Sequence, residues 1–261
     1  MPNRPTALVT GASSGIGADL ARELARDGHD LILAARRVAP MQALADELGK
    51  SGAVCTVLEA DLSRPGAAAA LMQEIERRSL AIDVLVNNAG LGELARFDRG
   101  DPGRISEMLQ VNIVALTELT RLVLPGMVAR GRGRVMLVAS IAAFQPGPTM
   151  AVYFATKAYV LSLGEAIAYE LRKSGVSVTV LCPGGTATEF FDVAGAGESR
   201  LKNAVRSLMS PAEVARIGYR ALKAGRPVVV TGRLNKVLTL AGRLAPHALT
   251  MPVTSVLMAE K

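Results

Sequence analysis

A serine, a tyrosine and a lysine are the side chains whose types and spacing point most directly to proton chemistry. Tyr153 and Lys157 are four residues apart in a predicted helix, so their side chains share one face. A phenol has a pKa of about 10, and a neighbouring ammonium stabilises the phenolate and lowers that pKa. Ser140 ends the apolar run VMLVAS, where a strand is expected to end. Together the three groups predict proton exchange with a substrate oxygen.

A glycine-rich loop, TGASSGIG at residues 10–17, lies between an apolar run and an amphipathic one. Gly11 allows a sharp turn off a strand, Gly15 lets backbone approach a phosphate, and Gly17 lets a helix pack close to a sheet. The N–H groups and the dipole at the start of the following helix favour a pyrophosphate. Many such loops are only tight turns, but the order strand, loop and helix favours a dinucleotide site here.

The end of the second apolar run, LILAARR at residues 31–37, carries no acidic residue. A carboxylate at this place usually binds the free 2′-hydroxyl of a ribose and would repel a 2′-phosphate. A guanidinium binds that phosphate through charge-assisted hydrogen bonds. We therefore expect Arg36, assisted by Ser13 or Ser14 and by Arg37, to select NADP(H). The alternative is that Arg36 is an ordinary surface arginine.

Short β-rich runs alternate with longer helical patterns, and these elements must position the groups above. Strands are predicted at residues 6–10, 30–34, 54–59, 84–87, 134–139, 177–182 and 228–231, and helices at 15–27, 41–50, 65–77, 102–130, 152–173 and 211–224. Such alternation implies right-handed crossovers and a parallel sheet. We predict a single-domain α/β fold, a Rossmann-like doubly wound sheet of about seven strands with helices on both faces. This domain covers residues 1–232, and residues 233–261 form a C-terminal extension.

The composition of the 261 residues limits the other functions that the chain can have. Hydrophobic residues make up 50% and aromatic residues 3%, which suits parallel strands buried on both faces. Cys55 and Cys182 are expected to be buried reduced thiols, and two histidines, His29 and His247, are too few for a metal site. The net charge of +7 is scattered along the chain, which argues against nucleic-acid binding. With no secretory signal or spanning segment apparent, we expect a cytoplasmic protein.

These motifs, in this order, resemble the short-chain dehydrogenase/reductase family along most of the chain. The matching elements are residues 10–17, Asp61-Leu62, NNAG at residues 87–90, Asn112, Ser140, Tyr153, Lys157, Pro183-Gly184 and Thr188. The resemblance implies an NADP(H)-dependent oxidoreductase that interconverts a carbonyl group and an alcohol by hydride transfer.

The resemblance also implies a role for each catalytic group. Tyr153 would be the general acid in ketone reduction, and Ser140 would orient and polarise the carbonyl. Lys157 would bind the nicotinamide ribose and lower the pKa of the tyrosine, while Asn112 would anchor a proton-relay water. The same comparison places the cofactor against Gly11, Ser13, Ser14, Gly15, Ile16, Gly17, Arg36, Arg37, Asp61, Leu62, Asn88, Ala89, Gly90, Tyr153, Lys157, Pro183, Gly184, Thr186 and Thr188.

Apolar residues in the predicted loops favour a hydrophobic ketone or aldehyde as the small-molecule substrate. They are Leu91, Leu94, Phe144, Phe190, Phe191 and Val193. A different interpretation is a non-catalytic, NADP(H)-sensing binding protein on the same fold. Such a protein would tolerate loss of the tyrosine or the lysine, and this sequence keeps both.

The C-terminal extension departs from the 3-oxoacyl carrier-protein reductases of the family, which end soon after the seventh strand. The departure argues against a role in fatty-acid synthesis, and it leaves open whether the expected homo-oligomer is a dimer or a tetramer. Leu234, Val237, Leu238, Ala241 and Leu244 recur at helical spacing with basic residues between them. This helix would pack on its own domain or on a second subunit, which we favour, or lie on an anionic membrane surface.

Overall fold

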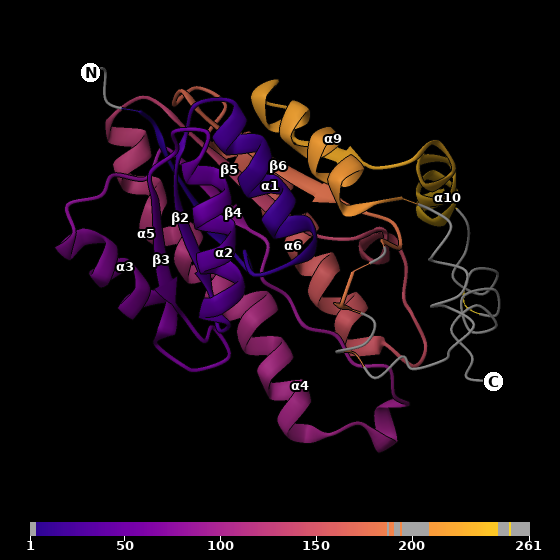
Figure 1. The fold of residues 1–261 in the computed structure, drawn as a ribbon. Helices are drawn as coiled ribbons and strands as arrows, with labels where there is room; N and C mark the ends of the chain where they lie inside the picture. The colour runs from indigo at the N-terminus through magenta and orange to yellow at the C-terminus, as the bar shows by residue number, and fades with distance from the viewer. Residues whose placement is uncertain (1–3, 187, 191–193, 195–208, 245–250, 252–261) are drawn as a thin grey trace.

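Seven parallel strands form one sheet in the order β3-β2-β1-β4-β5-β6-β7 (Figure 1). The structure is a computed structural model that describes residues 4–186, 188–190, 194, 209–244 and 251. The strands are β1 (Thr6–Thr10), β2 (Asp30–Ala35), β3 (Cys55–Glu59), β4 (Val84–Asn87), β5 (Gly133–Val138), β6 (Val176–Cys182) and β7 (Val228–Val230). The order reverses direction between β1 and β4, which is the position where open α/β sheets bind their ligands.

Helices cover both faces of the sheet, as predicted. They are α1 (Gly15–Arg26), α2 (Val38–Gly49), α3 (Ala67–Arg77), α4 (Pro102–Leu109), α5 (Leu116–Ala129), α6 (Ala151–Glu170), α9 (Pro211–Lys223) and α10 (Arg233–Leu244), with short 3-10 turns at Phe97–Arg99 and Ile141–Phe144. One hydrophobic core contains side chains of α1, α2 and α9, and the other contains side chains of α3, α5 and α6. Figure 1 shows α1 and α9 side by side on the first face.

The strands supply both cores because their side chains alternate between the two faces. In β1, Ala7 and Val9 belong to the first core and Leu8 to the second. In β2, Leu33 belongs to the first core and Ile32 to the second. The continuous apolar runs in the sequence are therefore strands buried on both sides, which confirms the predicted fold class.

The predicted helix at residues 102–130 is divided by a π-helical segment, Gln110–Ala115, that separates α4 from α5. A π-turn holds one more residue than an α-turn, so the apolar pattern alone does not reveal it. The whole span, Pro102–Ala129, is the one described helix long and apolar enough to cross a membrane by length and composition. Its α5 part packs against β4 and β5, and 44% of its most apolar window is buried.

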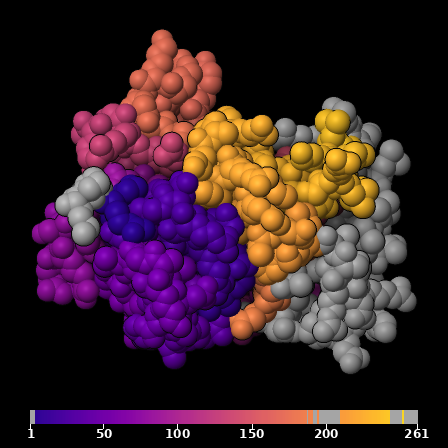
Figure 2. Space-filling view, turned by 45° about the horizontal axis from the view of Figure 1, so that its top comes forward, coloured from indigo at the N-terminus to yellow at the C-terminus, as the bar shows by residue number. Residues whose placement is uncertain are grey.

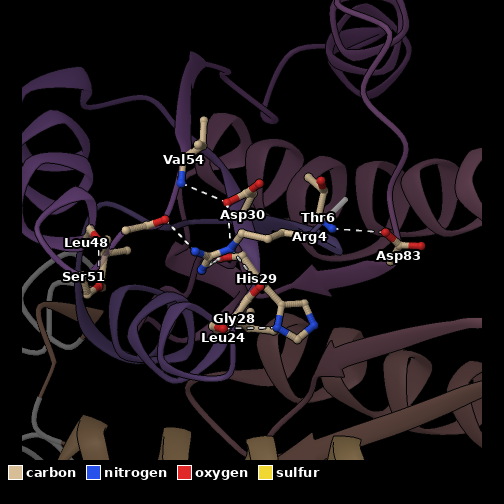
Figure 3. Close-up of polar contacts among 11 residues, drawn as sticks. Arg4, Thr6, Leu24, Gly28, His29, Asp30, Leu48, Ser51, Val54 and Asp83 are labelled. Carbon is tan, nitrogen blue, oxygen red and sulfur yellow. Dashed lines mark hydrogen bonds and ion pairs between the residues drawn. The ribbon is translucent and has the colours of Figure 1, made fainter. Parts of the chain in front are cut away.

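Polar contacts join the amino ends of the strands, opposite the edge that carries the predicted site (Figure 3). Arg4 donates to the carbonyl oxygens of Gly28 at 3.0 Å and Gly52 at 2.6 Å, and it pairs with Asp30. The Nδ1 atom of His29 lies 3.1 Å from the carbonyl oxygen of Leu24, and burial lowers the pKa of this imidazole. These groups connect the starts of neighbouring strands, which gives them a structural role.

The two cysteines are both free thiols. Cys182 is buried at the end of β6, as expected. Cys55 is only half-buried because β3 is the edge strand of the sheet, and burial still raises the pKa of its thiol to about 11. Among the described residues, no group of histidine, cysteine and acidic side chains forms a candidate metal site.

Candidate active site

The glycine-rich loop follows β1, and its backbone leaves no room for side chains. Gly11 has φ +64°, and a Cβ atom there would lie 2.8 Å from the Asn88 side chain. Gly15 has φ +56°, and its Cβ would lie 3.0 Å from Thr188. At Gly17 a Cβ would lie 2.4 Å from the Gly11 carbonyl oxygen, so Gly17 allows α1 to start directly against the loop. Gly11 and Gly15 are required by conformation and by space, and Gly17 by space alone.

The end of β4 holds this loop in place. The Asn88 side-chain amide donates to the carbonyl oxygens of Thr10 at 3.0 Å and Gly11 at 3.2 Å. In return, the Thr10 hydroxyl accepts from the backbone N–H groups of Asn88 and Ala89 at 3.0 and 3.1 Å. The two neighbouring strand ends at the reversal point of the sheet therefore hold each other, and the N–H groups at the start of α1 are pre-positioned for an anion.

Two arginines follow β2 at the other side of the loop, and only one of them is bound by an acid. Arg37 donates to Glu189 at 2.6 Å and to Ser14 at 3.1 Å. Arg36 is exposed and lines the same cavity as Asp61. The pKa of the Asp61 carboxyl is lowered mainly by its hydrogen bond from Ser63, with a smaller contribution from the Arg36 charge. A cationic group therefore lies where the sequence predicts the 2′-phosphate contact.

Ser140, Tyr153 and Lys157 come together at the carboxyl end of β5. Ser140 lies two residues beyond the strand, and its hydroxyl accepts from the backbone N–H of Ala142 at 3.1 Å. Tyr153 and Lys157 lie one turn apart on α6, with the lysine Nζ 5.7 Å from the centre of the tyrosine ring. This Nζ atom donates to the carbonyl oxygen of Val138, the last residue of β5, at 2.9 Å. The strand end therefore positions both the serine and the lysine.

Burial determines the protonation of this group. It raises the pKa of Tyr153 to about 12, although the hydrogen bond with Ser140 acts in the opposite direction. It also lowers the pKa of Lys157 to about 8. The expected lowering of the tyrosine pKa by the lysine is therefore not seen in this geometry, because the ammonium is directed to Val138 rather than to the phenol oxygen. Near neutral pH the phenol keeps its proton and the lysine keeps its charge.

Asn112 lies in the π-helical segment and is almost fully buried. Its Oδ1 accepts from the backbone N–H of Leu91 at 2.8 Å, and its Nδ2 donates to the Leu91 carbonyl oxygen at 2.9 Å. Nδ2 also donates to the Thr156 hydroxyl at 3.0 Å, and that hydroxyl donates to the carbonyl oxygen of Tyr153. The side chain of Asn112 therefore connects the loop after β4 to the helix that carries the tyrosine.

One cavity of about 860 Å³ joins these groups. It extends from the glycine loop past Ser140, Tyr153 and Lys157 to the start of α10. Its wall near the tyrosine is apolar: the Phe190 ring lies 5.1 Å from the Tyr153 ring, centre to centre. The cavity has the length of a dinucleotide site followed by space for an apolar substrate.

Comparisons with known proteins agree with this geometry. Residues 5–199 match the family described as short chain dehydrogenase. The chain is 39% identical over 188 residues to "Oxidoreductase UcpA" of Escherichia coli (strain K12), which covers 70% of each sequence. The chain belongs to the short-chain dehydrogenase family. It is therefore an oxidoreductase, and the family resemblance seen in the sequence is confirmed.

Two solved structures superpose on most of the short-chain dehydrogenase described here. The short-chain dehydrogenase from Sphingobium yanoikuyae in complex with NADPH is 35% identical, with a TM-score of 0.79 over 91% of this chain and 92% of that one. The bulky-bulky ketone specific alcohol dehydrogenase from Comamonas testosteroni is 29% identical, with a TM-score of 0.77 over the same shares of the two chains. The NADPH complex of the first structure supports a site for a nicotinamide dinucleotide in this fold.

The fold of this short-chain dehydrogenase brings nearly all predicted site residues to the cavity wall. Gly17 and Asn112 are the two exceptions, since they brace the loops behind the wall instead. Of the residues expected to contact substrate, Leu91, Phe144 and Phe190 line the cavity, whereas Leu94 is buried behind it. Phe191 and Val193 lie outside the described residues.

Two contributions to the cavity were not predicted from the sequence. One is Glu189, which pairs with Arg37 but belongs to no sequence motif that would predict a place in the site. The α10 residues Leu234 and Leu238 line the cavity, although their helical spacing predicted a packing surface or a membrane surface and not a part of the site. The position of Asn235 explains their placement: its side chain lies against Gly184, which brings the start of α10 to the loop after β6.

Proposed function

We propose that this short-chain dehydrogenase is an NADP(H)-dependent carbonyl reductase that converts a hydrophobic ketone or aldehyde to an alcohol. The observation that carries the proposal is the position of Ser140, Tyr153 and the buried Lys157 ammonium in the same cavity as the glycine-rich loop. This places groups able to donate a proton next to a site shaped for a dinucleotide.

In the proposed reaction, the bound cofactor supplies a hydride to the carbonyl carbon. The Ser140 hydroxyl orients the carbonyl oxygen, and Tyr153 donates its proton to that oxygen as the C–H bond forms. The high pKa of the tyrosine suits this direction, because the phenol is protonated before the reaction. Lys157, held by Val138, would bind the sugar, and its charge lies 5.7 Å from the centre of the ring that becomes a phenolate. A proton from solvent then restores the phenol.

The choice of NADP(H) rests on the charges at the end of β2. Arg36 is exposed at the cavity and is followed by Arg37, whose guanidinium is held by Glu189 and Ser14. The strand end itself carries no acidic residue, whereas an NAD-binding protein usually has a carboxylate there. The NADPH complex of the Sphingobium yanoikuyae relative supports the same choice.

The choice of a hydrophobic carbonyl rests on the cavity wall beyond the tyrosine. Phe144, Met150, Phe190 and Leu238 present carbon atoms there. An apolar substrate would gain about 25 cal/mol for each Å² of apolar surface that it buries against them. The ketone specificity in the name of the Comamonas testosteroni relative is consistent with this proposal.

Replacement of Tyr153 by phenylalanine tests the proposal. The variant keeps the ring that packs on Phe190 but lacks the transferable proton, so we expect turnover to fall about 10²–10⁴-fold. NADPH binding, measured by fluorescence titration, should be kept. The assay is NADPH oxidation over aliphatic, aromatic and steroid ketones and aldehydes.

Tyr159→Phe is the matched control, because Tyr159 lies on the same helix but is exposed, and its hydroxyl is hydrogen-bonded to that of Thr117. This variant should keep wild-type turnover. A Tyr153→Phe enzyme that still reduces ketones would refute the assigned role. A wild-type protein that binds NADPH but reduces none of the carbonyls would instead favour the NADP(H)-sensing alternative.

A further inference from the structure

Helix α10 packs on the protein through its polar face. Asn235, Thr239 and Gly242 recur at helical spacing and are buried. The Asn235 amide donates to the Thr231 carbonyl oxygen at 2.7 Å, and Gly242 lies against Gln145. The opposite face is apolar and exposed. This is the reverse of an ordinary surface helix, whose apolar stripe is turned to the core.

We call the exposed side chains Leu234, Val237, Leu238 and Leu240 the apolar stripe. Val237 is 65% exposed and Leu240 is 59% exposed, so the stripe is not covered by the described part of the fold. Several large apolar side chains on two consecutive turns form an exposed patch of the kind that marks an interaction surface. In Figure 2 the yellow atoms of α10 lie on the surface of the molecule.

Exposed cations accompany the apolar stripe. Arg233 and Lys236 belong to the first turn of α10 and are both exposed. The first turn of the helix contains no acidic residue. Apolar side chains with basic residues at their border fit the interface of a bilayer that contains anionic lipids. If two copies of the chain paired through the stripe, these same cations would be brought to one interface and repel each other.

The stripe is continuous with the active-site cavity. Leu234 and Leu238 belong to the stripe and also line the cavity, while Val237 and Leu240 do not line it. A surface that covered the stripe would therefore lie at the mouth of the cavity. Whatever binds the apolar stripe would therefore also contact the entrance to the active site.

From these observations, we propose that α10 lies on an anionic lipid bilayer through its apolar stripe, with Arg233 and Lys236 at the headgroups. The mouth of the cavity would then open at the bilayer surface, where an apolar carbonyl compound is concentrated. This last consequence rests on the proposed function, whereas lipid binding itself does not.

Flotation of the full-length protein with vesicles tests the proposal. The vesicles contain phosphatidylglycerol and phosphatidylcholine in equal amounts, or phosphatidylcholine alone. We expect the wild type to float with the anionic vesicles and to be released as salt is raised. Val237→Ser with Leu240→Ser should weaken binding at least tenfold, because two apolar side chains no longer enter the bilayer. Lys236→Glu should weaken binding to the vesicles that contain phosphatidylglycerol and should not change binding to those of phosphatidylcholine alone.

Val54→Ser with Phe97→Ser is the matched control, since both side chains are at least as exposed but lie on other elements. This control should float like the wild type. The proposal is overturned if the wild type does not float, or if the α10 double variant floats equally well. It is also overturned if light scattering shows that the stripe instead pairs two copies and that the double variant separates them.

The proposed function has a separate readout in the same proteins. Reduction of a water-soluble ketone by NADPH should be unchanged in the Val237→Ser, Leu240→Ser double variant, because neither side chain lines the cavity. Flotation does not require turnover, so failure of one proposal leaves the other open to test.

Discussion

Asn112→Asp should make the stability of this enzyme depend strongly on pH. The buried side chain donates from Nδ2 to the Leu91 carbonyl oxygen at 2.9 Å and to the Thr156 hydroxyl at 3.0 Å. In the ionised variant, an acceptor replaces that donor and faces the Leu91 oxygen directly. One buried carbonyl oxygen then loses its partner, which costs about 1–3 kcal/mol. Burial of the unpaired carboxylate charge adds a further cost, so we expect the free energy of unfolding to fall by about 4 kcal/mol in total.

The sign of the pH dependence follows from the protonated form. A protonated carboxyl can again donate to the Leu91 oxygen, so burial and this hydrogen bond raise the folded-state pKa of the new aspartate above its unfolded value of about 3.9. Between the two pKa values the folded protein binds more protons than the unfolded chain, so stability falls as pH rises through this window. The deficit should be full above the folded-state pKa and should shrink as pH falls below it.

Thermal unfolding at pH 5 and pH 7.5, with the wild type measured at each pH, tests this reasoning. A loss of about 4 kcal/mol corresponds to a lowering of Tm by about 8–16 °C for a chain of this size. Asn112→Leu should lose stability equally at both pH values, since it cannot ionise. Gln73→Glu, an amide-to-acid change at an exposed position of α3, should stay within about 0.5 kcal/mol. If Asn112→Asp has the same Tm as the wild type at pH 7.5, Asn112 does not have the proposed bracing role.

Two further predictions concern the cofactor and the proton. Arg36→Asp should lower the ratio of kcat/KM for NADPH to kcat/KM for NADH about 10²-fold, because a charge-assisted contact with the 2′-phosphate becomes a repulsive one. The control Arg99→Asp, on an exposed turn, should leave this ratio unchanged. An unchanged ratio in Arg36→Asp would show that Arg36 does not contact the 2′-phosphate. The kcat/KM for ketone reduction should fall as pH rises through about 8, where Lys157 loses its charge, while the tyrosine with a pKa of about 12 remains protonated. A pH–rate profile that stays flat to pH 9.5 would contradict the requirement for a charged lysine.

Much of the fold could be predicted because both of its cores are encoded by simple periodicities. Strands buried on two faces produce apolar runs such as residues 6–10, and glycines that leave no space for a Cβ, such as Gly11, produce a recognisable loop. Ser140 and Lys157 could be placed for the same reason. One follows the end of a strand and the other lies one turn from Tyr153, so local geometry determines their positions.

Contacts between segments that are distant in sequence could not be predicted in this way. The pairing of Arg37 with Glu189 joins residues 152 positions apart, and no local pattern relates them. The π-helical segment changes which face Asn112 presents without changing the composition of the helix. For α10, the spacing of apolar residues was clear, but the buried face is selected by Asn235 fitting against Gly184. A polar side chain with a specific partner therefore overrides the usual burial of the apolar face.

The site depends on hydrogen-bonded side chains that connect its loops to strand ends and to α6. Asn88 fixes the glycine loop to the end of β4, and Asn112 fixes the segment after β4 to α6. Lys157 is held by the last carbonyl of β5, next to Ser140. Because each brace ends on the sheet or on a helix packed against it, the phosphate loop, the phenol and the ammonium keep fixed relative positions before any ligand binds. A substitution at a brace should therefore lower kcat through misplacement of these groups even though it removes no reacting atom.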